Sequence, residues 1–248
     1  MAKKFHHIKF DEKSHTYTNT KTKQKYLSCT SFISKFEKPF VATEKLTAKT
    51  QKELGLTHEE VIAFWAKTNE VAKIRGSKIH KFLEEDFKKD RVVKKPIKDK
   101  VTPYYSEMEL YSYRKFFERI RQNEKDNYEV MIEQILYSDE FEIAGQSDKV
   151  LIDTDITIQD FKSNDKDLTK SYSNFKGPID HIRASPLEEY SLQLSIYGYF
   201  AEKIFNKTVK ELKIYHLRNS RVEEIVLPYR KYDVLNMLHY YKENNKQI

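Results

Sequence analysis

The sequence predicts an α/β fold in which helices flank a central mixed β-sheet. Apolar residues recur with helical spacing in the first half of the chain and again near its end, and strand-like segments joined by tight polar turns lie between them. No linker rich in Gly, Ser or Pro divides the 248 residues. We therefore predict one domain over residues 1–248, with a mixed sheet because helices and strands alternate in the second half.

The composition excludes several classes of protein. With 39% hydrophobic and 33% charged residues, and only 5 Gly and 6 Pro, the chain is neither collagen-like nor of low complexity. It has no apolar run of about 18 residues, so no membrane-spanning helix is expected. Residues 1–7 lack the apolar stretch of a signal peptide, which favours the cytoplasm of a bacterial or phage-infected cell. The single Cys29 excludes an internal disulfide, and we expect a small, partly buried residue beside a strand end.

Residues 1–56 form a basic N-terminal segment. The formal charge of the chain is +7, and residues 1–50 alone account for all of it. This uneven charge indicates a polyanionic partner, although lysines also serve solubility. Within the segment, short strands are predicted near Ile8 and Phe10, at residues 16–18 and at residues 26–27, with a turn over residues 19–22.

Residues 57–126 are predicted to be mainly helical. Thr57 and Glu60 have the spacing of a capping box, which predicts a helix beginning there. Further helical stretches are expected over about Glu70 to Lys88 and over Tyr104 to about Glu124.

Residues 127–217 form the predicted core, and residues 218–248 add a C-terminal strand and helix. The predicted strands are Glu129–Tyr137, Phe141–Ile152, Ile156–Lys162, Lys210–Leu217 and Arg221–Leu227, and the predicted helices are Leu187–Asn206 and Arg230–Asn245. Val130, Met131 and Ile132 are apolar at consecutive positions, which is typical of a strand covered on both faces. A polar loop is expected over residues 163–185.

The residues that indicate chemistry lie at the ends of these strands. Asp160 and Lys162 share one face of their strand, while Phe161 points to the other. A short hairpin can bring Asp148 beside Asp160, and Glu133 lies among apolar residues, where a carboxylate must be paired, protonated or bound to a cation. Converging carboxylates suit Mg²⁺ or Mn²⁺, and Lys162 could orient a water and offset developing charge. A buried Asp–Lys ion pair that only joins strands is the alternative.

Two predicted helices carry further candidates. Gly76 and His80 are one turn apart, with His80 flanking the face that packs on the sheet, and Gln193 and Tyr197 share one face at i, i+4 spacing. Core packing explains each pair equally well when it is taken alone.

Taken together, these motifs resemble the PD-(D/E)xK nuclease superfamily, in its RecB-like exonuclease branch. The matching elements occur in order between Gly76 and Tyr197, about half of the chain: Gly76…His80, Glu133, Gly145-Gln146-Ser147-Asp148, Asp160-Phe161-Lys162 and Gln193…Tyr197. The flanks are similar to phage-type and mitochondrial genome maintenance exonucleases, whose N-terminal Ser-Val-Thr segment corresponds to Ser28-Cys29-Thr30. The resemblance implies a restriction-endonuclease-like core with helical and N-terminal hairpin additions.

The resemblance also implies a role for each residue. Mg²⁺ or Mn²⁺ would be bound by His80, Asp148, Asp160 and the carbonyl of Phe161, with Glu133 nearby and Lys162 as the catalytic lysine. Gln193 and Tyr197 would brace the site and contact DNA, and Arg75, beside Gly76, is a further substrate-binding candidate. Since iron–sulfur members of the family need several cysteines, no cluster is expected here.

The expected activity is that of a metal-dependent DNA exonuclease acting on single strands or DNA ends in replication, recombination or repair. A single-strand-binding or recombination protein would be a natural partner. Lys166, Lys170 and Lys176 are expected to guide the strand. The alternatives are a catalytically silent DNA-binding module of the same fold and a structure-selective endonuclease. The motifs leave polarity, strand preference and oligomeric state open.

Overall fold

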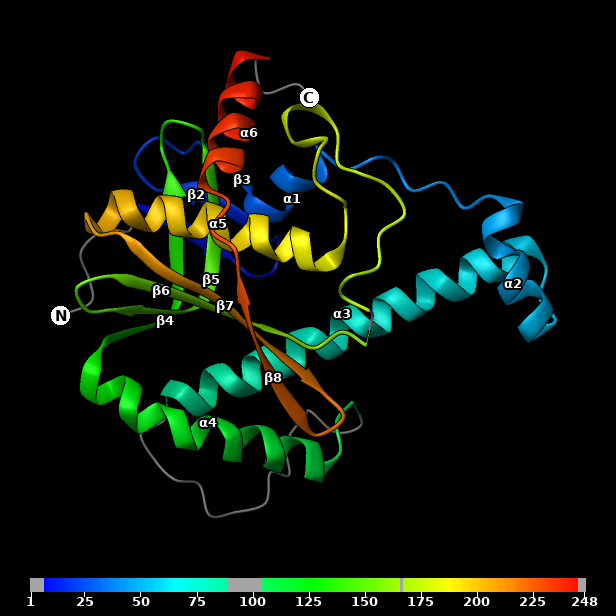
Figure 1. The fold of residues 1–248 in the computed structure, drawn as a ribbon, viewed down its shortest axis with the longest axis horizontal. Coiled ribbons are helices and arrows are strands. Elements are labelled where there is room, and N and C mark those ends of the chain that lie inside the picture. Colours follow the sequence, from blue (N-terminus) through cyan, green and yellow to red (C-terminus); the bar gives the residue numbers. More distant parts are fainter. Residues whose placement is uncertain (1–6, 89–103, 166, 245–248) are drawn as a thin grey trace.

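A mixed sheet with helices on both faces forms the centre of the protein (Figure 1). The computed structural model describes residues 7–88, 104–165 and 167–244. In these ranges the strands follow the order β1-β2-β3-β5-β6-β7-β8, and β4 pairs along β5. Their bounds are β1 Ile8–Asp11, β2 Thr16–Asn19, β3 Lys25–Ser28, β4 Glu129–Ser138, β5 Ile143–Ile152, β6 Ile156–Lys162, β7 Val209–Arg218 and β8 Arg221–Leu227. The β3–β5 and β6–β7 pairs are parallel and the others antiparallel, which confirms the predicted mixed sheet.

Helices form a layer on each side of the sheet (Figure 1). The helices are α1 Cys29–Ser34, α2 Glu44–Leu54, α3 His58–Lys88, α4 Glu107–Asn127, α5 Pro186–Phe205 and α6 Lys231–Glu243, with a short 3₁₀ turn at Gly177–Ile179. Of these, α2 lies beyond the sheet against the first part of α3 (Figure 1). One apolar cluster joins α1, α5 and α6 to one face of the sheet, and a second joins α3 and α4 to the other face around Phe161 and Tyr215. The architecture is compatible with a restriction-endonuclease-like core.

Local capping signals set several helix starts. The Thr57 and Glu60 capping box is present, because the Glu60 carboxylate accepts from Thr57 N at 2.8 Å and Thr57 Oγ1 accepts from Glu60 N at 3.3 Å. A second capping box, between Ser106 and Glu109, begins α4 at Glu107, three residues later than the sequence predicts. Each box satisfies backbone N–H groups that the first helical turn leaves without partners.

One prediction about the elements is wrong. Residues 58–88 form one continuous helix of 31 residues, where the sequence predicted two stretches. Residues 66–74, where the two stretches meet, are all exposed, so no buried apolar face marks the continuity. The strand β4 is covered on both faces as predicted, because Met131 packs against the cluster of α1, α5 and α6 and Ile132 packs against the cluster of α3 and α4. Both side chains are only half-buried, since β4 lies at an edge of the central strands. The helices α1 and α2 were not foreseen.

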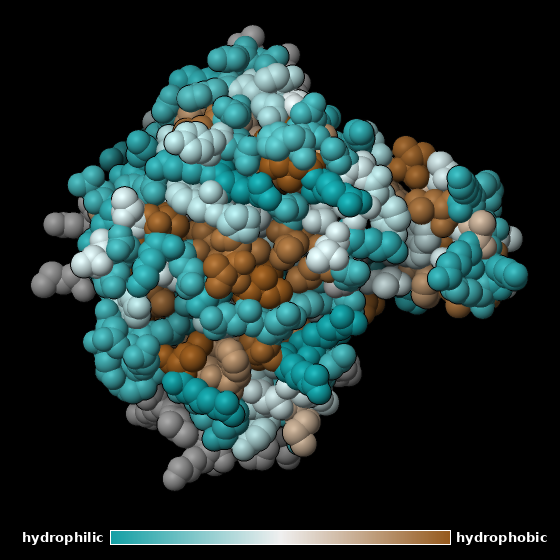
Figure 2. All heavy atoms as spheres, viewed as in Figure 1, coloured by the Kyte–Doolittle hydropathy of each residue, from teal (hydrophilic) through white to brown (hydrophobic). Residues whose placement is uncertain are grey.

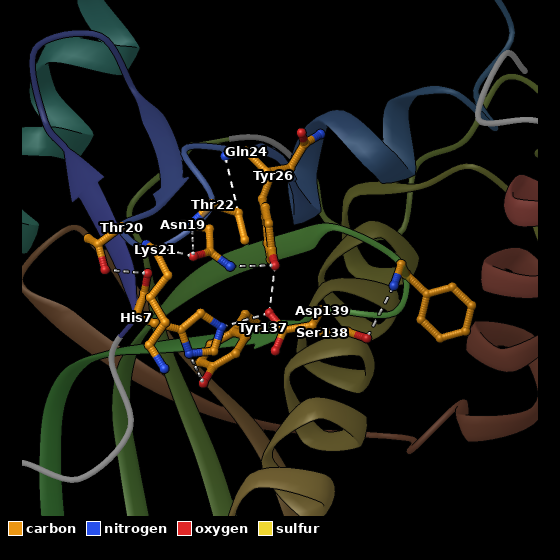
Figure 3. Close-up of polar contacts among 11 residues, drawn as sticks. His7, Asn19, Thr20, Lys21, Thr22, Gln24, Tyr26, Tyr137, Ser138 and Asp139 are labelled. Carbon is orange, nitrogen blue, oxygen red and sulfur yellow. Dashed lines mark hydrogen bonds and ion pairs between the residues drawn. The ribbon is translucent and has the colours of Figure 1, made fainter.

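Hydrogen bonds of a polar cluster connect the N-terminal hairpin to the β4–β5 turn (Figure 3). The Asp139 carboxylate accepts hydrogen bonds from Tyr26 Oη at 2.5 Å and from His7 Nε2 at 2.8 Å. Asn19 Nδ2 donates to the same tyrosine oxygen at 3.2 Å. These contacts complement the two-residue pairing of β3 with β5, so the predicted hairpin becomes an extension of the sheet.

Among the described residues, no helix is both long enough and apolar enough to cross a membrane. This agrees with the lack of an apolar run in the sequence.

Candidate active site

Asp148 and Asp160 lie where two neighbouring strands separate. The antiparallel pairing of β5 with β6 ends at Lys149 and Gln159, and each aspartate is the next residue beyond that end. The two strands remain linked at this point through a side chain, because Phe161 N donates to the carboxylate oxygen Asp148 Oδ2 at 2.6 Å. The separation of β5 and β6 therefore places two carboxylates side by side in the interior, as the hairpin between the strands predicted.

A histidine and a lysine pair with these carboxylates. His80 Nδ1 of α3 lies 3.0 Å from Asp148 Oδ1, and Lys162 Nζ lies 2.6 Å from Asp160 Oδ2. Asp148 is 7% exposed and Asp160 is 3% exposed, so both pairs are largely removed from water. Four residues predicted from three separate motifs are thus brought together by α3, β5 and β6.

Burial and mutual charge set the ionisation of the cluster. Burial disfavours the charged forms, but in the His80–Asp148 pair the attraction outweighs it, raising the pKa of His80 to about 9 and lowering that of Asp148. Burial and the neighbouring Asp148 raise the pKa of Asp160. Burial opposes the charge of Lys162, yet Asp160 and then Tyr190 hold the pKa of its ammonium above the usual value. Lys162 is accordingly a cation at neutral pH.

Glu133 faces the same cluster from β4 and has an unusual backbone conformation. The β4–β5 register pairs Ile132 with Lys149 and Gln134 with Ser147, which sets Glu133 opposite Asp148. Its φ of 55° lies in the left-handed region, which is unusual inside a strand and costs a residue with a Cβ about 1–3 kcal/mol. Burial, Asp148 and Glu84 raise the pKa of Glu133 to about 8.

Residues of α5 hold the lysine from the other side. Gln193 Oε1 accepts from Lys162 Nζ at 3.1 Å, and Gln193 Nε2 donates to Tyr197 Oη at 2.9 Å. The pair predicted from its i, i+4 spacing therefore forms a relay that ends on Lys162. Tyr190, one turn earlier, places its ring 4.5 Å from Lys162 Nζ.

Steric contacts explain why the Gly-x-x-Asp segment begins with a glycine. A Cβ added to Gly145 would come within 2.4 Å of the Tyr197 ring and 2.8 Å of Cys29 Sγ. Only glycine lets β5 pass this close to α5, which keeps Tyr197 in place behind Gln193. Cys29 is fully buried at this contact, so it packs as a small apolar residue, more deeply than the sequence suggested.

The remaining predicted residues lie on α3 and in the following loop. Gly76 faces Ser163, and an added Cβ would make only an ordinary 3.8 Å contact there. Arg75 Nη1 donates to Asp165 Oδ2 at 2.8 Å, and Arg75 Nη2 lies 3.4 Å from Glu109 Oε1. The guanidinium is thus bound to carboxylates of the protein itself. Lys170 lies over the Tyr172 ring, while Lys166 falls outside the described residues.

The chemistry of the donors suits a divalent cation, but their present arrangement does not assemble one site. Two aspartates, a nearby glutamate and an imidazole are donors that Mg²⁺ or Mn²⁺ accepts. Asp160 Oδ2 is buried and has no hydrogen bond of good geometry despite its ion pair with Lys162. Over the described ranges, however, no three His, Cys, Asp or Glu side chains are grouped so that they could hold a metal ion. The metal stays a prediction.

Sequence reasoning missed the roles of Tyr190, Glu84 and Asp165. Tyr190 lies one turn before Gln193 on α5, and this spacing could have placed it near Lys162. Glu84, one turn after His80, contributes to the raised pKa of Glu133. Asp165 carries no local signal, because its partner Arg75 is 90 residues away.

Comparison with known proteins identifies no family. No family model matches the chain, and no curated protein matches it. Among solved structures, a protein from Eubacterium rectale described as a "putative exonuclease" is 16% identical with a TM-score of 0.43, over 90% of this chain and 79% of that chain. The structure of SSO0001 is 12% identical with a TM-score of 0.31, over 70% of this chain and 74% of that chain. Because both TM-scores are below 0.5, we base no functional conclusion on either likeness.

Proposed function

We propose that the protein is a divalent-metal-dependent DNA exonuclease that hydrolyses phosphodiester bonds. The observation that carries the proposal is the buried cluster of Asp148, Asp160 and Lys162 at the separation of β5 and β6, with His80 against it. Burying two carboxylates and a lysine costs free energy, whereas burying apolar residues of similar size does not. A purely structural role therefore explains this cluster poorly. Single strands or DNA ends are the proposed substrates.

His80, Asp148, Asp160 and the Phe161 carbonyl would hold the metal, with Glu133 close by. When bound, Mg²⁺ or Mn²⁺ would polarise the scissile phosphate, lower the pKa of a water and stabilise the leaving oxygen. No iron–sulfur cluster is proposed, because the chain has one cysteine.

Lys162 would act as a fixed positive charge. Its raised pKa keeps the proton on Nζ, so the ammonium can donate to a water or a phosphate oxygen but cannot remove a proton at neutral pH. Gln193 and the Tyr190 ring restrict where Nζ can lie, which is the pre-organisation that electrostatic stabilisation of a transition state needs. Tyr197 would act through Gln193 and does not itself reach Lys162.

The test is degradation of labelled linear single- and double-stranded DNA in the presence of Mg²⁺. We expect cleavage that is abolished by EDTA and reduced at least a hundredfold in Asp160→Ala, because Asp160 is both a proposed ligand and the partner of Lys162. Tyr172→Phe, a change at an exposed ring, is the control and should leave the rate unchanged. Cleavage that survives both EDTA and Asp160→Ala would contradict the proposal.

The same assay distinguishes the alternatives. A covalently closed circular substrate is resistant to a strict exonuclease, so its cleavage would indicate a structure-selective endonuclease. DNA binding without cleavage of any substrate would indicate a silent module of this fold.

A further inference from the structure

The loop that follows β6 carries an aspartate held between two arginines. Asp165 Oδ2 accepts from Arg75 Nη1 at 2.8 Å, and Asp165 Oδ1 lies 3.8 Å from Arg218 Nε. The two arginines come from different elements, α3 and the end of β7. The Asp165 side chain is 55% exposed, so water reaches the place where the two cations meet.

Arg75 has contacts besides its ion pair with Asp165, and both arginines lie near the proposed catalytic cluster. The Arg75 guanidinium lies 4.7 Å from the centre of the Tyr105 ring and near Glu109, five residues before His80 on α3. Arg218 follows His216, which pairs with Lys162 across β6 and β7 and donates from Nε2 to Asn164 O at 2.7 Å. The two cations therefore flank the strand end that carries Lys162.

A groove begins at Arg218 and extends along β8. Its volume is about 1110 Å³. Its lining combines the apolar side chains of Leu168, Leu187, Val222 and Ile225 with the guanidinium groups of Arg218 and Arg221 and the carboxylates of Asp167 and Glu223. In Figure 2, apolar side chains gather on this face below α5 and beside β7 and β8. Apolar surface beside guanidinium groups suits a nucleoside attached to a phosphate, because the arginines bind the anion and the groove receives the sugar and base.

We infer that Arg75 and Arg218 form a phosphate-binding site for the DNA strand, that Asp165 occupies it in the free protein, and that the adjoining nucleoside lies in the groove along β8. An exposed carboxylate between two arginines contributes little to stability, so it can be displaced at small cost. A phosphate group has more acceptor oxygens than the Asp165 carboxylate, and its geometry likewise suits the paired N–H groups of a guanidinium. The inference rests on the proposed function, because the ligand is the substrate of that site.

The inference is tested by binding in the absence of cleavage. Fluorescence anisotropy with a fluorescein-labelled oligothymidylate in EDTA measures the affinity of wild type and variants over a range of salt concentrations. Asp165→Asn should bind about three- to tenfold more tightly, since the arginines lose their internal competitor. Arg218→Gln should bind more weakly by a similar factor, and its salt slope should fall by about 0.7, the value for one phosphate contact on a single strand.

Asp126→Asn is the matched control. It changes the net charge equally at an exposed position of α4, where its carboxylate accepts from Gln122 Nε2 at 2.7 Å, and it lies outside the lining of the groove. We expect an increase in affinity of less than about twofold. If Asp165→Asn and the control variant bind DNA more tightly by the same factor, the effect is general electrostatics and the inference is overturned. It is also overturned if Asp165→Asn melts like wild type but binds DNA no more tightly.

Two further results separate this inference from the proposed function. If wild type cleaves DNA in an Asp160-dependent way while Asp165→Asn and Arg218→Gln bind like wild type, only the inference fails. If wild type neither binds nor cleaves DNA, the proposed function fails and the inference with it. If Asp165→Asn gains affinity for polyglutamate but not for the oligonucleotide, the site serves an acidic protein and the inference is wrong.

Discussion

Glu133 is the residue whose conformation and charge are hardest to explain by packing. It has a positive φ within a strand, it faces Asp148, and its carboxyl is half-buried beside a second glutamate, Glu84. A glutamine or an apolar residue would avoid both the like charge and the cost of burial. The position therefore makes sense as part of a site that meets a cation or a proton.

The raised pKa of Glu133 predicts a pH-dependent effect of Glu133→Gln on stability. The pKa of Glu133 is about 8 in the folded protein, against an ordinary value of 4.5 for a glutamate, so the folded protein binds more protons than the unfolded chain between these values. Wild type therefore loses stability as pH rises through this window, and the neutral variant does not. Measured in EDTA, the melting temperature of Glu133→Gln relative to wild type should rise by about 3–8 °C between pH 5 and pH 8.5.

Glu129→Gln, at an exposed position of the same strand, controls for the loss of a carboxylate from β4. A difference between Glu133→Gln and wild type that stays constant with pH would contradict the prediction.

At the scale of elements, the sequence predicted best what local physics decides. Hairpin turns, the Thr57 capping box and the alternation of faces in β6 depend on neighbouring residues, and the structure confirms each of them. The continuity of α3 was missed, because residues 66–74 are all exposed and no buried apolar face joins the two predicted stretches. The position of β4 at an edge and the pairing of His80 with Asp148 depend on residues far apart in the chain, which no local pattern encodes.

A buried ion pair adds to the apolar contacts that attach α4 to the sheet. Lys149 of β5 is fully buried, its Nζ lies 2.9 and 2.7 Å from the Glu124 carboxylate oxygens, and Gln159 Nε2 donates to the same carboxylate at 3.2 Å. Lys149→Met should lower the free energy of unfolding by about 3–5 kcal/mol, because it leaves Glu124 buried without its partner. Denaturant unfolding measures this change.

Two variants make the prediction specific. The double variant Lys149→Met/Glu124→Leu should recover most of the loss, since it removes both charges. Lys115→Met, which breaks an exposed pair with Glu118 on α4, should cost less than about 1 kcal/mol. A double variant no more stable than Lys149→Met alone would show that packing, and not the unpaired charge, sets the cost.

At the scale of the whole molecule, the positive charge and the proposed site lie in different parts of the chain. The formal excess of +7 lies in residues 1–50, and the described part of that segment builds the hairpin, α1 and much of α2. The proposed ligands lie in the charge-balanced remainder, on α3, β5 and β6. Their carboxylates count as negative charges that a bound cation would offset, so the face toward DNA would be more positive than the formal charge suggests.

A metal held by His80, Asp148 and Asp160 would join a helix to two strands and so stabilise the fold as a whole. Excess Mn²⁺, at about a hundred times its dissociation constant, should add about 2.7 kcal/mol to the free energy of unfolding and raise the melting temperature by about 5–10 °C. Asp160→Asn should lose this gain, whereas Asp167→Asn, outside the cluster, should keep it. The measurement needs no turnover, so it separates metal binding from catalysis. An equal rise in wild type and Asp160→Asn would place the ion elsewhere and remove the metal from the proposed mechanism.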